Sequence, residues 1–162
     1  MIRIATPDDS NAICGIYDHY ILNSHATFET EPVSAQEMEK RIDHISKELQ
    51  LPYLVFEQNQ EILGYTYATQ WKPRAAYERT VETTVYVHPE EFGKGVGNQL
   101  YKALLEQLKN SGYHAIIGGI ALPNEPSISL HEKLGFVNVG ELKEVGFKFG
   151  IWIDVGYWQR IL

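Results

Sequence analysis

The sequence has only one cysteine, no long apolar run and fewer basic than acidic residues, and each shortage argues against a class of protein. Cys14 cannot form a disulfide within the chain, which fits a reducing compartment. The longest apolar stretch, residues 115–122, is much shorter than the ~20 residues that a membrane helix requires. The first residues lack the apolar run of a secretory signal. We therefore expect a cytoplasmic protein without a membrane partner.

The charge balance and the spacing of the polar residues exclude further functions. With 14 Lys and Arg against 21 Asp and Glu, the net charge is −7, which argues against nucleic acid as a partner. The sequence contains no Gly-x-Ser-x-Gly turn, so serine hydrolase chemistry lacks support. We expect no metal site. A single cysteine cannot supply a set of thiolate ligands, and the spacing typical of metal ligands is absent among five of the histidines, namely His19, His25, His44, His88 and His114.

The length of 162 residues and a hydrophobic fraction of 44% fit one domain over residues 1–162. Alternation predicts a first strand at residues 2–4. A helix follows Pro7, with one apolar face formed by Ile13, Ile16, Tyr17, Tyr20 and Ile21. A capping box at Ser34 and Glu37 starts a second helix that reaches about residue 49. The later patterns predict strands at 53–56, 62–71, 79–88, 114–121 and beyond 136, with helices after 95 and at 126–134. The order predicts an α/β fold with a mixed sheet.

The most informative segment is a strand that runs into Gly93, Gly95 and Gly97 at the start of an amphipathic helix. Glycine permits a sharp turn and close approach to a ligand. The unpaired N–H groups and positive dipole end of a helix start favour a pyrophosphate. A dinucleotide loop is excluded because Asn98 stands where its third glycine is required, and a Walker loop because no Gly-Lys-Ser/Thr triplet exists.

The remaining pattern, Gly93-x-Gly95-x-Gly97, resembles the acetyl-CoA pyrophosphate loop of the GNAT superfamily of N-acetyltransferases, with Phe92 where the family usually has glutamine or arginine. Residues 124–136 resemble the family segment beside the cofactor, with His131 where many members carry tyrosine. Together with residues 28–32, 80–82 and 154–159, these features make the chain similar to the phosphinothricin and methionine sulfoximine acetyltransferase branch.

The resemblance implies a mixed, mostly antiparallel twisted sheet flanked by about four helices, with acetyl-CoA as co-substrate. It implies a homodimer, and the aromatic residues of segment 146–158 suggest an interface. It places Val85, Tyr86 and Val87 along the pantetheine arm of the cofactor. The other implied cofactor contacts are Gly93, Lys94, Gly95, Val96, Gly97, Asn98, Asn124 and Lys133.

For catalysis we expect Glu82 to be the general base and His131 the acid or hydrogen-bond donor near the sulfur. Without the resemblance, Glu82 is equally well interpreted as a solvent-facing strand acid, and a lone histidine on a helix, such as His131, is usually structural. Arg74 can grip a carboxylate through two parallel N–H donors, which indicates an α-amino acid acceptor. The expected acceptor contacts are Phe28, Lys72, Pro73, Arg74, Tyr77, Glu82, Thr83 and Thr84.

Three functions stay open at this point. The first is acetyl transfer to a small amino-acid-like amine such as phosphinothricin, methionine sulfoximine or methionine sulfone. The second is acetylation of protein N-termini or lysines, which needs a long open groove. The third is a non-catalytic acyl-CoA sensor, which the presence of Glu82 disfavours.

Overall fold

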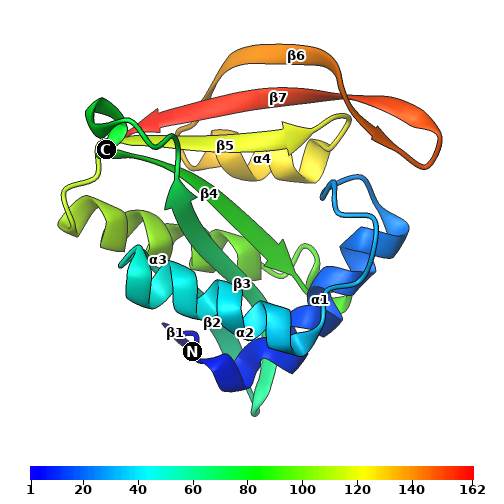
Figure 1. Cartoon of the computed structure of the whole chain (residues 1–162), viewed down its shortest axis with the longest axis vertical. Coiled ribbons are helices and arrows are strands. Elements are labelled where there is room, and N and C mark those ends of the chain that lie inside the picture. The colour runs from blue at the N-terminus through cyan, green and yellow to red at the C-terminus, as the bar shows by residue number, and fades with distance from the viewer.

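The computed structural model describes all residues 1–162 and confirms the predicted order of elements (Figure 1). The helices are α1 (Ser10–Asn23), α2 (Ala35–Asp43), α3 (Val96–Asn110) and α4 (Glu125–Lys133), with short helical turns η1 (Pro7–Asp9), η2 (His44–Glu48), η3 (Ala75–Tyr77) and η4 (Pro89–Glu91). The strands are β1 (Ile2–Ile4), β2 (Tyr53–Gln58), β3 (Glu61–Gln70), β4 (Thr80–Val87), β5 (Ala115–Ala121), β6 (Val137–Lys148) and β7 (Ile151–Ile161). No helix of the protein is both long and apolar enough to span a membrane.

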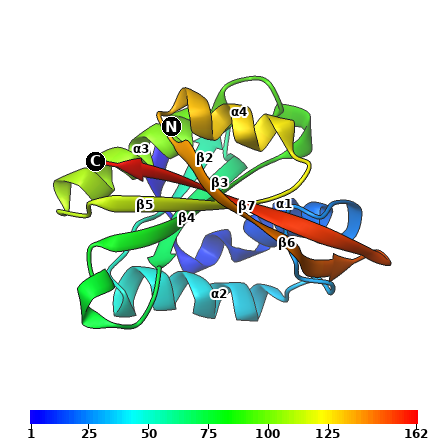
Figure 2. The ribbon, with the colours of Figure 1, turned by 90° about the horizontal axis from the view of Figure 1, so that it is seen from above.

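The seven strands form one sheet in the order β1-β2-β3-β4-β5-β7-β6. Every neighbouring pair is antiparallel except β4 and β5, which are parallel. Helices α1 and α2 cover one face of the sheet, and α3 and α4 cover the other (Figure 2). The mixed, mostly antiparallel sheet with four helices is therefore confirmed.

The core forms where the apolar stripes of the helices meet the sheet. Ile13, Ile16 and Ile21 of α1 are buried, as the predicted helical face requires. On the opposite face of the sheet, the stripe of α3 is also buried, including Leu100, Leu104 and Leu108. The second predicted helix is divided, because α2 ends at Asp43 and continues as the π-helical turn η2.

An ion pair fixes the start of the chain against η1. The Arg3 guanidinium donates two hydrogen bonds to the Asp9 carboxylate, both of 2.8 Å. The Thr6 amide donates a third bond to the same carboxylate, also of 2.8 Å. Burial raises the pKa of Asp9, but the bonds from Arg3 and Thr6 outweigh burial and hold that pKa below its usual value of 3.8.

The parallel pair in the middle of the sheet is short. Strand β4 pairs with β5 only through Thr80, Val81 and Glu82, opposite Ala115, Ile116 and Ile117. Beyond Glu82 the two strands separate, and Figure 1 shows β4 and β5 diverging toward the loop between α1 and α2. The last five residues of β4 therefore have no partner strand on the β5 side, and this parting of the two strands is called the split below.

Candidate active site

Strand β4 presents its main chain to the split. The amide of His88 donates to the Leu63 carbonyl of β3 (2.8 Å), so by strand alternation the main-chain groups of Val85 and Val87 point the other way. Tyr20 of α1 reaches Val87 from the helical side: its hydroxyl donates to the Val87 carbonyl (2.6 Å) and accepts from the Val87 amide (3.3 Å). Main-chain donors and acceptors that face away from β3 suit an amide-rich ligand, but at Val87 such a ligand would compete with the Tyr20 hydroxyl, which already bonds both groups.

The side chain of Tyr86 is part of an aromatic cluster. Its ring packs against Tyr17, Tyr20 and Tyr65, with centroids 5.2, 4.8 and 5.5 Å away. Burial raises the pKa of Tyr86 well above 10. The side chain therefore belongs to the core between α1 and the sheet, and by the same alternation the N–H and C=O of Tyr86 point to β3 rather than to the split.

The glycine-rich turn carries a group of free amides. The N–H groups of Gly93, Gly95, Val96, Gly97 and Asn98 have no main-chain acceptor, whereas the Lys94 amide donates to the Glu91 carbonyl. Gly93 and Gly95 have φ values of +76° and +85°, in the left-handed region that other residues rarely adopt. Amides that converge at the N-terminus of α3 form the kind of site that binds phosphate oxygens.

Gly97 is needed for a different reason, the close packing of α3. A Cβ at this position would lie 3.3 Å from the Val87 side chain and 3.5 Å from Leu130 of α4. The missing side chain thus lets the start of α3 approach both β4 and α4. Phe92, before the turn, is 57% exposed and lies 6.3 Å from the Tyr20 ring, centroid to centroid.

The other predicted cofactor residues lie at the ends of helices. The Asn124 side chain caps α4 by accepting a hydrogen bond from the Ser127 amide (3.2 Å), a structural role that the prediction did not include. Lys133 is exposed at the last turn of α4. The side-chain oxygen of Asn98 is buried without a partner. Lys94 forms an ion pair with Glu91 (3.0 Å) beside the glycines.

Glu82 is the last residue of β4 that pairs with β5, so it lies where the split begins. A Cβ on Gly119 of β5 would be 3.1 Å from the Glu82 carboxylate and 3.4 Å from the Tyr157 ring. Gly119 therefore makes room for both side chains on one face of the sheet. Burial raises the pKa of Glu82 above its usual 4.5, and no basic side chain counteracts this. A half-buried carboxylate of raised pKa is suited to accept a proton near neutral pH.

Tyr157 is a neighbour of Glu82 that sequence reasoning did not assign to the site. The Trp71 ring lies edge-on to Tyr157, with centroids 5.8 Å apart. Burial, followed by the charge of Glu82, raises the pKa of Tyr157. No sequence signal placed Tyr157 here, since that requires knowing that Gly119 and Tyr157 are paired across β5 and β7.

His131 lies on the opposite face of the sheet from Glu82. A Cβ on Gly118 would lie 2.5 Å from His131 Nε2, and successive residues of a strand face opposite sides. Its Nδ1 donates to the Ser127 carbonyl (2.7 Å), so Nε2 accepts from the Tyr101 hydroxyl (3.0 Å). Burial lowers the pKa of His131, and the bond to Ser127 offsets this in part. The neutral ring has no free N–H in this arrangement.

The structure separates two adjacent residues predicted to contact the acceptor. The Thr83 side chain is buried, 2.5 Å from the Tyr101 hydroxyl and within reach of the Ile117 carbonyl (3.3 Å). It therefore faces α3 rather than the side of Glu82. Thr84 points to the Glu82 side, where Tyr67 is opposite it on β3. Alternation along a strand requires that the two side chains point to opposite faces, but it does not say which of them lies on the Glu82 face.

The other predicted acceptor residues lie on two loops. Lys72, Pro73 and Arg74 are exposed between β3 and β4, and Tyr77 is 38% exposed. The Lys72 amine lies 5.5 Å from the centre of the Trp71 ring, which connects this loop to Tyr157 and Glu82. Phe28, between α1 and α2, is 43% exposed and packs on Gly146 of β6.

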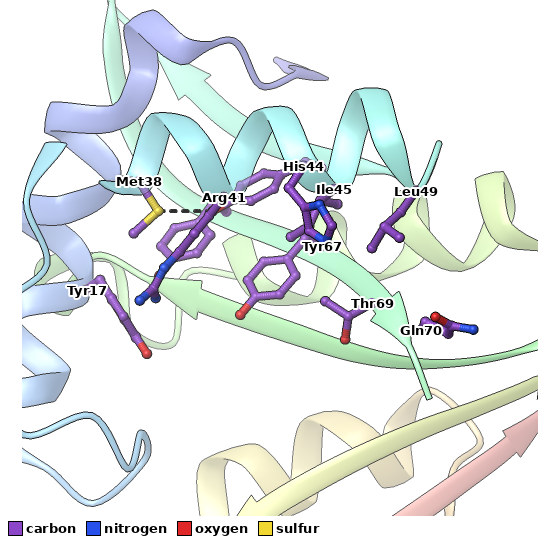
Figure 3. Close-up of a pocket in the computed structure, with 11 residues that line it drawn as sticks. Tyr17, Met38, Arg41, His44, Ile45, Leu49, Tyr67, Thr69 and Gln70 are labelled. Atoms are coloured by element: carbon purple, nitrogen blue, oxygen red, sulfur yellow. Dashed lines mark hydrogen bonds between the residues drawn. The ribbon is translucent and has the colours of Figure 1, made fainter. Parts of the chain in front are cut away.

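A cavity of about 400 Å³ lies between α2 and β3, on the Glu82 face (Figure 3). Tyr17, Tyr53, Tyr65 and Tyr67 form much of its wall. At its end, Thr69 is opposite Glu82 in the register of β3 and β4. The remaining lining residues are Met38, Arg41, His44, Ile45, Leu49 and Gln70.

Arg41, which hangs into this cavity in Figure 3, is already neutralised. Its guanidinium donates to both oxygens of the Glu29 carboxylate (2.6 and 3.0 Å) and to Glu37 (3.3 Å). These bonds leave the exposed Arg74 as the better candidate for binding a carboxylate. No group of three or more His, Cys, Asp or Glu side chains is arranged to hold a metal ion.

Comparison with known proteins gives consistent matches over nearly the whole chain. Residues 2–156 match the acetyltransferase (GNAT) domain family. The chain is 42% identical to the phosphinothricin N-acetyltransferase of Streptomyces viridochromogenes, over 98% of this chain and 86% of that protein. It is 35% identical to the L-methionine sulfoximine/L-methionine sulfone acetyltransferase of Salmonella typhimurium, over 98% and 92%. A phosphinothricin acetyltransferase from Sinorhizobium meliloti, solved with acetyl-CoA, superposes with a TM-score of 0.95 at 36% identity, over 100% and 88%.

Proposed function

The chain belongs to the GNAT family of acetyltransferases, and from this we propose that it transfers an acetyl group from acetyl-CoA to the α-amine of a small amino-acid-like acceptor. Phosphinothricin, methionine sulfoximine, methionine sulfone and related L-amino acids are the proposed acceptors. The observation that carries the proposal is the position of Glu82, a half-buried carboxylate of raised pKa where β4 and β5 part.

The residues of the split and of the glycine turn fit acetyl-CoA. The free amides at Gly93, Gly95 and residues 96–98 are proposed to hold the pyrophosphate. The main chain of Val85 and Val87 is proposed to bond the amide-rich arm, with Tyr86 and Asn124 beside it and with Lys94 and Lys133 near the phosphates. When bound, the co-substrate supplies an activated acetyl thioester.

Glu82 is proposed to act as the general base. An α-ammonium group must lose a proton before its nitrogen can attack, and the Glu82 carboxylate accepts that proton directly or through one water. In the overall reaction a C–N bond replaces the C–S bond. The acceptor nitrogen loses two protons, one before and one after attack, which leave through Glu82 to solvent, and the thiolate sulfur takes up one proton. A main-chain amide of β4 in the split is proposed to polarise the thioester carbonyl.

His131 is the proposed source of the proton for the sulfur. The neutral ring has no proton to give, because Nδ1 donates to Ser127 and Nε2 accepts from Tyr101. We propose that Nε2 first takes a proton from solvent and then passes it on through Tyr101, whose hydroxyl bridges His131 and Thr83. A Tyr101→Phe variant removes that bridge and leaves the ring. If His131 acts through Tyr101, Tyr101→Phe and His131→Ala lower kcat by similar factors and the double variant lowers it no further.

The acceptor is proposed to lie between the Glu82 face of the sheet and the two predicted loops. Arg74 binds its carboxylate, and Lys72, Pro73, Tyr77 and Phe28 shape the surrounding wall. Of the two threonines, Thr84 is the proposed direct contact, while Thr83 acts from behind the strand through Tyr101.

A thiol-release assay tests the proposed function. Acetyl-CoA is supplied with phosphinothricin, methionine sulfoximine, single amino acids, polyamines or peptides. We expect saturable, Glu82-dependent release with the amino-acid-like acceptors. Activity confined to peptides would favour the protein acetyltransferase alternative, and binding of acetyl-CoA without turnover would favour the sensor. If an Arg74→Ala variant has unchanged acceptor KM and kcat, Arg74 does not bind the acceptor carboxylate.

We propose that the enzyme is a cytoplasmic homodimer, because its co-substrate is a cytoplasmic metabolite and its β6–β7 hairpin exposes many large apolar side chains. Phe147 and Trp152 are 59% and 63% exposed and lie 4.8 Å apart, centroid to centroid. Contiguous exposed apolar surface of this kind is typical of an interface. Sedimentation equilibrium should show a dimer that a Phe147→Ser, Trp152→Ser double variant converts to a monomer. A wild-type monomer at assay concentration would refute this.

A further inference from the structure

The segment between the end of α1 and Phe28, residues 24–28, crosses the open end of the split and is called the strap below (Figure 1). It contacts both sides of the opening. On one side, the Tyr86 hydroxyl of β4 donates to the Ala26 carbonyl (3.4 Å). On the other, His25 Nε2 lies 3.0 Å from the Pro123 carbonyl in the loop after β5. The strap therefore joins two strands that do not pair with each other at this level.

The strongest contacts of the strap are made by a buried lysine. Lys148, at the end of β6, is 3% exposed. Its amine donates to the Ser24 carbonyl (2.8 Å) and to the Thr27 carbonyl (2.9 Å), and lies 4.9 Å from the centre of the Phe149 ring. No ion pair of the protein includes Lys148. A buried ammonium group without a carboxylate is tolerated only where other groups solvate it.

The position of the lysine explains how its charge is tolerated. Ser24 is the C-cap residue of α1, so the ammonium lies at the negative end of that helix dipole. The carbonyls of Ser24 and Thr27 then replace water around the ammonium group. In return, the lysine fixes the main chain of the strap at two points.

Gly146, two residues before Lys148, completes the arrangement. Both residues face the strap by strand alternation, and a Cβ at Gly146 would overlap the Phe28 ring. The ring thus rests on the bare backbone of β6 while the lysine holds the main chain beside it. The position of Phe28 is therefore fixed in two ways, by the hydrogen bonds from Lys148 to the strap and by the packing of its ring on Gly146.

We propose that Lys148 is a positioning residue that determines acceptor recognition by holding the strap, and with it Phe28, across the open end of the split. The inference rests on the proposed function in one respect, the assignment of Phe28 to the acceptor site. In this proposal Lys148 itself contacts neither substrate. Its removal leaves the glycine turn and the β4 main chain, which are the proposed cofactor side, unchanged.

The first test is steady-state kinetics of Lys148→Met, with Lys143→Met as the matched control on the same strand. Lys143 is exposed and pairs with Glu141 and Asp154 outside the proposed site. Since a charge-assisted hydrogen bond to the strap is lost, we expect acceptor KM to rise about tenfold and acetyl-CoA KM to stay within about twofold. Lys143→Met should leave both KM values unchanged. Equal changes in both KM values for Lys148→Met would overturn the proposal.

A second variant displaces Phe28 without removing the charge. Gly146→Ala should raise acceptor KM as Lys148→Met does, and Phe28→Ala should abolish any further effect of either substitution, because all three act through one side chain. Lys148→Arg keeps the donors and should recover part of the loss. Additive effects of Phe28→Ala and Lys148→Met would overturn the proposal, and so would a Lys148→Arg variant no better than Lys148→Met.

A readout independent of activity follows the strap directly. Chymotrypsin cleaves after Phe28, and the rate of this cut, identified by mass, should rise in Lys148→Met but not in Lys143→Met. A cut no faster than in the wild type would overturn the inference even where kinetics changed. A wild-type enzyme that acetylates none of the amino-acid-like acceptors would instead refute the proposed function, while the cleavage experiment would still report on the strap.

Discussion

Replacing Glu82 by glutamine removes the proposed base and nearly preserves the shape of the side chain. Gly119 leaves room for the Glu82 side chain, so the amide fits the same space next to Tyr157. Positioned general bases typically contribute 10²- to 10⁴-fold, so we expect kcat/KM for the acceptor to fall roughly a hundredfold or more. The KM for acetyl-CoA should not change, because the glycine turn and Val85 and Val87 are untouched.

The same substitution should not lower stability at neutral pH. Burial raises the folded-state pKa of Glu82 above 4.5, so the folded protein binds this proton more tightly than the unfolded chain does. Stability at this site therefore falls as pH rises from the unfolded pKa through the folded one. The uncharged glutamine avoids that loss, and Tm at pH 7 should be equal to or higher than that of the wild type.

Thiol release measured from pH 5 to 9 provides the assay, with thermal unfolding measured on the same samples. In the wild type, the acidic limb of kcat/KM reports ionisation of Glu82 together with that of the acceptor amine. In Glu82→Gln only the amine contribution should remain. A variant that keeps activity within about threefold and an unchanged pH profile would refute the assignment of Glu82 as the base. A variant that loses activity because it unfolds would refute the stability argument.

Three further predictions concern the framework of the site. Gly95→Ala should raise the KM for acetyl-CoA and lower stability by about 1–2 kcal/mol, since alanine is strained at φ +85°, as titration and urea unfolding would measure. Gly118→Ala should lower stability by about 1–3 kcal/mol because its Cβ would crowd the His131 ring, and an unchanged Tm would contradict this packing. Asp9→Asn should cost about 1.5–3 kcal/mol at pH 7 by breaking the charged bonds to Arg3. Because the folded pKa of Asp9 lies below 3.8, that difference should shrink as pH falls through it, and a difference independent of pH would contradict the pairing.

Local sequence patterns predicted the elements well because each depends on neighbouring residues. The apolar face of α1, the hairpin of β2 and β3, and the helix that follows the glycines were all visible as periodicity and turn residues. The glycine turn was the most predictable part of the site. Its geometry depends on the positive φ values of Gly93 and Gly95, and a glycine in the sequence is the usual indication of such a backbone conformation.

Contacts between distant strands were not predictable from the same patterns. No local pattern around Gly118 and Gly119 indicated a role for them, yet one makes room for His131 and the other for Glu82. Their roles depend on which face each residue takes, and therefore on the pairing of β5 with β4 and β7. The burial of Lys148 was likewise hidden, since its partners are carbonyls more than a hundred residues away.

The short parallel pair between β4 and β5 gives the two sides of the site different capacities for change. The proposed donor side is made largely of main-chain atoms, and no point mutation can delete a peptide group. The proposed acceptor side is made of side chains such as Arg74 and Phe28, each replaceable in a single step. Selection can therefore alter which amine is modified while the acetyl donor stays fixed, so that one inherited scaffold can give rise to enzymes with different acceptors.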